Sequence, residues 1–200
     1  GHAGAAEWKP DRVKEIIVAT GAGGGQDKSA RTVQRILQDG KLLPVAATVQ
    51  NKPGGGGLVA WTYLNQKGAD GHFIAISNPT LLTNHITGRS NINYTDLTMV
   101  ANLFTESVAI SVRAESPIRS IKDLADILRK DVTSVSFSVG SSLGSANHIA
   151  MARLARLSGA DPRKMRAVVF QGGGQAMTAV LGGHVDLMAS AANNVVPHLQ

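Results

Sequence analysis

The sequence lacks cysteine and is poor in aromatic residues. With no cysteine among its 200 residues, the chain can form no disulfide, no thiolate metal site and no cysteine nucleophile. Aromatic residues make up 4% of the sequence, whereas glycine occurs 22 times, so the core must be built mainly from Val, Ile, Leu, Ala and Met. No apolar run in the sequence is long enough to span a membrane. The length leaves open one large domain or two small ones.

Concentrated charge and clustered histidines are also missing. The formal charge is +6, from 20 Lys and Arg against 14 Asp and Glu, and the basic residues are scattered. This pattern is typical of a solvated basic surface that attracts anions, and it disfavours a nucleic-acid partner. The six histidines are dispersed, without the spacing of a helical metal site. We therefore expect no metal and no other cofactor.

Short apolar runs alternate with segments of helical periodicity along the whole chain. Strands are expected at residues 13–19, 45–49, 73–77, 135–138, 167–170 and 185–189, and helices at residues 27–37, 58–64, 79–86, 121–130, 147–157, 174–181 and 193–200. A strand pair or crossover is expected between residues 100 and 112. The alternation predicts an α/β fold with two lobes, residues 1–105 and 106–200, each a mostly parallel sheet flanked by helices.

Turns rich in Gly, Ser or Asn follow the expected strands. Ligands of open α/β sheets bind outside the carboxyl ends of the strands, and uncapped helix N-termini attract anions. The turns at residues 20–29 and 138–148 are therefore suited to a carboxylate or phosphate. Asp27, taken alone, is better explained as a cap of the following helix. None of the turns contains arginine, so we expect hydroxyls and helix N-termini to hold the anion.

Two nucleotide-binding motifs fail at the first turn. A P-loop requires Gly-Lys-Ser/Thr, but Lys28 and Ser29 follow Asp27. The dinucleotide fingerprint would begin at Gly21, but Gln26 occupies the position of its third glycine.

A hydrolase pattern remains. Residues 140–144 spell Gly-x-Ser-x-Gly around Ser142, and Asp186 and His198 follow in hydrolase order. The loop continues past Gly144 before a helix begins, whereas a nucleophile elbow requires a tight turn. Ser145 and His148 could also pair, but no acid is evident to orient the histidine. An α/β-hydrolase-like or phosphate-handling enzyme therefore stays open as an alternative to a binding protein.

Several segments in a fixed order carry a resemblance to a known family. They are Gly-Gly-Gly-Gln-Asp at residues 23–27, Asn-Lys-Pro-Gly-Gly-Gly at 51–56, Ala-Asp-Gly at 69–71, Ser-Pro-Ile at 116–118, Gly-Ser-Ala-Asn-His-Ile at 144–149, Phe-Gln-Gly-Gly-Gly at 170–174, and Leu-Gly-Gly-His-Val-Asp at 181–186. On these segments the chain resembles the substrate-binding proteins of tripartite tricarboxylate transporters (the TctC/Bug type). Residues 144–148 and 172–174 resemble the tricarboxylate-type branch.

The resemblance implies a two-lobed type II periplasmic-binding-protein fold without catalysis. It implies an extracytoplasmic protein that captures a small di- or tricarboxylate in the interlobe cleft and delivers it to integral membrane subunits of a secondary transporter. The ligand-binding residues expected on this basis are Gly23, Gly24, Gly25, Asp27, Ser77, Asn78, Ser142, Gly144, Ser145, Asn147, Gly173, Gly174 and Asn193. Catalytic residues and metal ligands are not expected.

The resemblance also carries an expectation about chain length. Members of the family continue well beyond position 200 and return to the first lobe. We therefore expect the return to be missing here, with the last helix still running at Gln200. A second chain or a second copy would then cover the open sheet edge of the first lobe.

Overall fold

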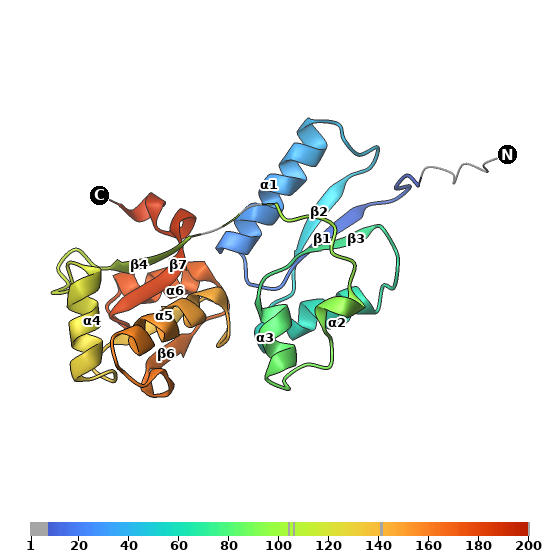
Figure 1. Cartoon of the computed structure of the whole chain (residues 1–200). Helices are drawn as coiled ribbons and strands as arrows, with labels where there is room; N and C mark the ends of the chain where they lie inside the picture. The colour runs from blue at the N-terminus through green and yellow to red at the C-terminus, as the bar shows by residue number, and fades with distance from the viewer. Residues whose placement is uncertain (1–7, 104, 106, 141, 200) are drawn as a thin grey trace.

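A computed structural model describes residues 8–103, 105, 107–140 and 142–199, and these form two lobes (Figure 1). Lobe 1 is the three-stranded sheet β2-β1-β3 with α1–α3, and lobe 2 is the four-stranded sheet β4-β7-β5-β6 with α4–α6. Lobe 1 contains β1 (Lys14–Val18), α1 (Gly25–Asp39), β2 (Ala47–Asn51), the 3-10 turn η1 (Gly55–Gly57), α2 (Leu58–Asn65), β3 (Phe73–Ile76) and α3 (Thr80–Ile86). Lobe 2 contains β4 (Val108–Val112), α4 (Ile121–Lys130), β5 (Ser136–Val139), α5 (Ala146–Leu157), β6 (Arg166–Val169), α6 (Gly173–Leu181) and β7 (Leu187–Ala191).

The sheets are parallel except at one edge. In lobe 1, β1 pairs in parallel with both β2 and β3. In lobe 2, β5 pairs in parallel with β6 and β7, whereas β4 runs antiparallel to β7. The carboxyl ends of the parallel strands of each lobe therefore open on one edge, where the following turns gather.

The central strand of lobe 1 buries both of its faces. Ile16 and Val18 pack in one cluster with Ala30 of α1. Ile17, on the other face, packs with Trp61 of α2 and Leu81 of α3. Alternate residues of a strand point to opposite faces, so the continuous apolar run of β1 is explained by helices on both sides.

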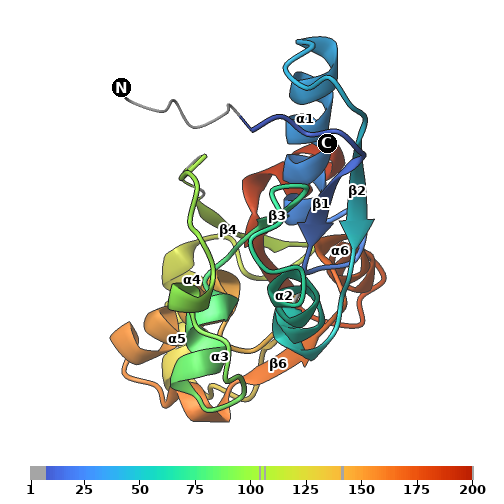
Figure 2. The ribbon, with the colours of Figure 1, turned by 90° about the vertical axis from the view of Figure 1, so that its right-hand side faces the viewer.

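Lobe 2 repeats this arrangement with a larger cluster. Phe137 of β5 and Leu187 of β7 pack with Leu124 of α4 and Met151 of α5. On the opposite face of β7, Met188 packs in a second cluster with side chains of α6. Figure 2 shows α4 and α5 on one side of this sheet and α6 on the other.

The α/β fold predicted from the alternation is confirmed, with two differences. The helix expected at residues 193–200 is absent from the described residues; the 3-10 turns η4 (Ala192–Asn194) and η5 (Val196–His198) follow β7 instead. Pro197 lies in η5, and its ring fixes φ and removes a backbone donor. Where a strand pair or crossover was expected, between residues 100 and 112, the described residues form one strand, β4, which pairs with β7.

The two lobes contact each other through their turns. The backbone N–H of Gly21, after β1, donates to the carbonyl of Gln171, after β6, at 2.9 Å. The segment that joins the lobes runs from η2 (Tyr94–Asp96) to β4. The boundary expected between the lobes, at residues 105 and 106, lies in this segment, in which Phe104 and Glu106 are outside the described residues. None of the helices in the described part of the chain has both the length and the apolar character to cross a membrane.

Candidate functional site

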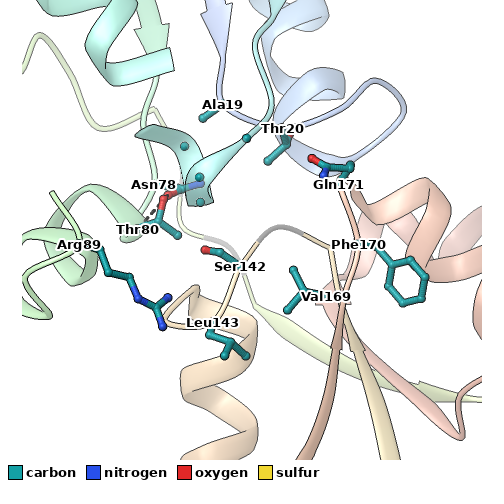
Figure 3. A pocket seen from close by; sticks show the side chains of 14 residues that line it. Ala19, Thr20, Asn78, Thr80, Arg89, Ser142, Leu143, Val169, Phe170 and Gln171 are labelled. Carbon is teal, nitrogen blue, oxygen red and sulfur yellow. Dashed lines mark hydrogen bonds between the residues drawn. The ribbon is translucent and has the colours of Figure 1, made fainter. Parts of the chain in front are cut away.

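A pocket of about 270 Å³ lies between the two lobes (Figure 3). Lobe 1 lines it with residues that follow its three strands and α3, namely Ala19, Thr20, Gly54, Gly55, Gly56, Gly57, Asn78, Thr80 and Arg89. Lobe 2 lines it with Ser142, Leu143, Val169, Phe170 and Gln171. The pocket therefore lies where the carboxyl ends of the parallel strands meet, as expected for this class of fold.

Two hydroxyls on the pocket wall are buried without a partner. Thr20 and Ser142 are each 7% exposed, and the Oγ1 of Thr20 and the Oγ of Ser142 have no hydrogen-bond partner among the described residues. Burying an unsatisfied hydroxyl costs about 1–3 kcal/mol. A ligand oxygen between the lobes would remove this cost, so the two hydroxyls mark the pocket as a polar binding site.

The turn after β1 is organised by Asp27. One carboxylate oxygen accepts from the backbone N–H of Gly23 at 3.0 Å and from Nε of Arg31 at 2.9 Å, and the other accepts from Nδ2 of Asn51 at 3.0 Å. Burial alone would raise the pKa of Asp27, but the hydrogen bonds from Arg31, Gly23 and Asn51 outweigh it and lower the pKa. The same Asn51 amide also donates to the carbonyl of Thr20 at 3.0 Å. Asp27 and Asn51 thus fix the backbone that presents Thr20.

The turn after β2 requires glycine. Residues 54–57 are all glycine with φ between +56° and +129°, a region that other L-residues avoid. A Cβ on Gly56 would lie 3.0 Å from Oγ of Ser142 in the other lobe. The carbonyl of Gly56 accepts from Nδ2 of Asn84 at 3.0 Å. This turn therefore brings bare backbone to the pocket and against lobe 2.

The turn after β5 ends in a capped helix. The Oγ of Ser145 accepts from the backbone N–H of His148, which makes Ser145 the N-cap of α5. The Nδ1 of His148 accepts from the N–H of Gly144 at 3.2 Å. Burial lowers the pKa of His148, and Arg89 lowers it further. The neutral ring therefore acts as an acceptor that holds Gly144, and it is not positioned as a base for Ser145.

The expected binding residues fall into several groups. Ser142 and Asn78 line the pocket, and the side-chain oxygen of Asn78 accepts from the N–H of Thr80 at 2.8 Å. Ser145 is buried beside the pocket, Gly144 precedes it, Asn147 is half-buried in the first turn of α5, and Ser77 is exposed.

The remaining expected residues lie at the starts of α1 and α6, except Asn193. Gly24 caps α1 and Gly25 begins it. Gly23, Gly173 and Gly174 line a second cavity of about 240 Å³, with Lys28, Asn194 and His198 among its other lining residues. Asn193 lies in η4, and its side chain is outside what the structure describes. Gly24 of lobe 1 also approaches Gly173 of lobe 2. A Cβ on Gly24 would lie 3.0 Å from the backbone nitrogen of Gly173.

Thr20, Arg89 and Gln171 line the pocket but were not predicted from the sequence. Thr20 begins the turn at residues 20–29 and Gln171 lies in the segment 170–174, so the strand-end pattern could have found both. Arg89 lies beyond α3, after Gly88, in a segment without a motif. Only the folded chain brings its guanidinium to the pocket.

The hydrolase constellation is not assembled. Asp186 accepts from the N–H and the hydroxyl of Ser136, at 2.7 and 2.6 Å, at the start of β5. Ser142 follows the opposite end of that strand, and His198 lines the second cavity. Ser141, the second residue of the Gly-x-Ser-x-Gly stretch, lies outside the described residues. In the described part of the chain, no three His, Asp or Glu side chains gather as a metal site would need.

Residues 30–200 match the family described as the tripartite tricarboxylate transporter family receptor, TctC. A UPF0065 protein of Cupriavidus necator is 26% identical over 179 residues, which cover 88% of this chain and 52% of that protein. The chain therefore spans about half the length of that curated relative.

Solved structures agree with this match. MatC from Rhodopseudomonas palustris with bound malate is 26% identical with a TM-score of 0.81, over 94% of this chain and 63% of that one. A TctC solute-binding protein from Polaromonas is 28% identical with a TM-score of 0.60, over 94% and 63%. The fold, the strand-end pocket and the match over residues 30–200 lead to one conclusion: the chain belongs to the TctC family of tripartite tricarboxylate transporter receptors.

Proposed function

We propose that this protein is an extracytoplasmic receptor that captures a small di- or tricarboxylate in the pocket between its lobes. In this proposal it delivers the ligand to the membrane subunits of a tripartite transporter and performs no chemistry on it. The observation that carries the proposal is the pair of buried, unpartnered hydroxyls of Thr20 and Ser142 on facing lobes. The malate named with MatC, which is 26% identical to this chain over the aligned residues, supports a carboxylate as the ligand.

The pocket offers donors suited to a carboxylate and no competing negative charge. Its lining contains hydroxyls, an asparagine, a glutamine and one arginine, but neither Asp nor Glu. Hydrogen bonds from neutral donors to a charged acceptor are worth about 1.5–3 kcal/mol each. Two such hydroxyls and the backbone of the glycine turn can therefore orient one carboxylate group.

Calorimetric titration of the protein with malate and citrate tests the proposal. We expect one carboxylate to bind, and Ser142→Ala to weaken it roughly tenfold or more. Ser134→Ala, on an exposed turn of the same lobe, should leave the affinity unchanged. Mass spectrometry of small molecules released on denaturation would identify a ligand retained from the cell.

Two results would contradict this function. One is the absence of binding for every small mono-, di- and tricarboxylate tried. The other is hydrolysis of a p-nitrophenyl ester by the wild type that Ser142→Ala abolishes, which would assign the Ser142 hydroxyl to catalysis.

A further inference from the structure

Arg89 is anchored to the pocket by its backbone. Its N–H donates to the carbonyl of Asn84 at 2.8 Å. Asn84 is 2% exposed, and its Nδ2 donates to the carbonyl of Gly56 in the pocket wall at 3.0 Å. Arg89 therefore follows α3 at a position fixed relative to the glycine turn, although its own side chain is exposed.

The guanidinium of Arg89 has no acidic partner within the described ranges. No ion pair or side-chain hydrogen bond of Arg89 is formed there, whereas Arg12, Arg31, Arg113, Arg129 and Arg163 each pair with a carboxylate. The first turn of α5, next to the pocket, also contains no acidic residue. A guanidinium on the wall of a pocket without Asp or Glu gives that pocket a net positive charge.

The positive charge and the buried hydroxyls occupy different sides of the pocket. Figure 3 shows Thr20 at one side and Arg89 at the opposite side, with Ser142 between them. The guanidinium extends toward the segment of Leu143 and the start of α5. Arg89 also lies close enough to His148 to lower its pKa, after the larger effect of burial. One anionic group bound at the hydroxyls would thus leave Arg89 available to a second.

We propose that Arg89 is a specificity-determining residue that binds the second anionic group of the ligand and selects dicarboxylates over monocarboxylates of the same size. This inference rests on the proposed function and deepens it. The planar guanidinium can donate two parallel hydrogen bonds to one carboxylate. A methyl group in place of that carboxylate would leave the guanidinium without this partner.

Two matched ligands and three variants test the inference. Malate and 2-hydroxybutyrate share a carboxylate and a 2-hydroxyl, and differ in whether the last carbon is a carboxylate or a methyl group. We expect Arg89→Gln to weaken malate binding by ~10- to 100-fold and 2-hydroxybutyrate binding by less than about threefold. Arg89→Lys should bind malate more tightly than Arg89→Gln does, because lysine keeps the positive charge but cannot donate two parallel hydrogen bonds from a planar group. Arg35→Gln, which removes an exposed arginine from α1, controls for net charge and should change neither affinity.

The outcomes separate the two proposals. Equal weakening of both ligands in Arg89→Gln, or no weakening of either, overturns the role of Arg89 and leaves a carboxylate receptor in place. Tighter binding of 2-hydroxybutyrate than of malate by the wild type also overturns it. Failure of the wild type to bind any carboxylate removes the proposed function and the inference together. Circular dichroism of each variant confirms that it has folded.

Discussion

Ser142 and Ser145 lie three residues apart but have different hydrogen bonds. The Ser142 hydroxyl has no partner in the described part of the chain, whereas the Ser145 hydroxyl caps α5. A capping oxygen accepts one hydrogen bond and keeps its own proton for another acceptor. We propose that Ser145 supports the helix and can still donate its proton to a ligand.

We predict that Ser145→Ala lowers both the stability of the protein and its affinity for the carboxylate. Loss of an N-cap costs about 1 kcal/mol, which urea denaturation measures. Ser120→Ala is the matched control, because Ser120 caps α4 through the N–H of Asp123 and does not line either pocket. It should lower the stability by a similar amount and leave the affinity unchanged. An unchanged affinity in Ser145→Ala as well would restrict Ser145 to its structural role.

Asp27 gives a pH-dependent prediction. Its pKa is lowered in the folded state by Arg31, Gly23 and Asn51 against the opposing effect of burial. A carboxylate with a lowered folded pKa stabilises the protein above its unfolded pKa of about 3.9, and this contribution is lost as the pH falls through the folded value. Asp27→Asn should therefore be less stable than the wild type at pH 7, and the difference should shrink below about pH 4.

Urea denaturation at several pH values between neutrality and the acid range checks this. Asp39→Asn, at the exposed end of α1, serves as a control variant in the same helix. A stability difference between Asp27→Asn and the wild type that stays constant down to the lowest pH would show that the ionised carboxylate is not what holds the turn.

At the scale of elements, the turn after β5 touches α3 of the other lobe. Gly144 has φ of +86°, and a Cβ there would lie 2.9 Å from Oγ1 of Thr83. Gly159 has a similar φ of +83°, with nothing within 4 Å of the Cβ position. The two glycines therefore share a backbone requirement but differ in whether the other lobe approaches them.

We predict that Gly144→Ala and Gly159→Ala both lower the free energy of unfolding by about 1–2 kcal/mol, through the strain of a left-handed alanine. Only Gly144→Ala should also weaken ligand binding, because its methyl group pushes Thr83 and hence the lobes apart. Titration with malate measures the difference. Equal affinities in the two variants would mean that the approach of Gly144 to Thr83 plays no part in binding.

The elements were largely predictable from the sequence because each apolar run is bounded by its own turn residues. The helix expected at residues 121–130 has the bounds of α4, whose N-cap Ser120 accepts from the N–H of Asp123. The helix expected after β7 does not form in the described residues, because Pro197 would fall inside it and lacks a backbone donor; short 3-10 turns form there instead. Arg89 could not be found, since its place at the pocket depends on how α3 packs under the glycine turn, through Asn84 and Gly56. A local pattern does not record such a contact.

At the scale of the whole molecule, the lobes have separate cores. Each of the four buried hydrophobic clusters lies within one lobe. The contacts between the lobes described above are backbone and small side chains, such as the hydrogen bond from Gly21 to Gln171 and the approach of Gly56 to Ser142. Interfaces of this kind permit one domain to rotate relative to the other.

We therefore predict that the ligand shifts the protein toward a closed arrangement, since it would bridge Thr20 of lobe 1 and Ser142 of lobe 2. Small-angle X-ray scattering with saturating malate should give a smaller radius of gyration than without ligand. The decrease should be smaller in Gly144→Ala, where the added methyl group opposes closure, and it should persist in Gly159→Ala. If saturating ligand, verified by calorimetry on the same sample, leaves the scattering curve unchanged, the pocket is preformed and the hydroxyls meet their ligand without motion of the lobes. Any affinity lost in Gly144→Ala would then arise from distortion of the turn itself.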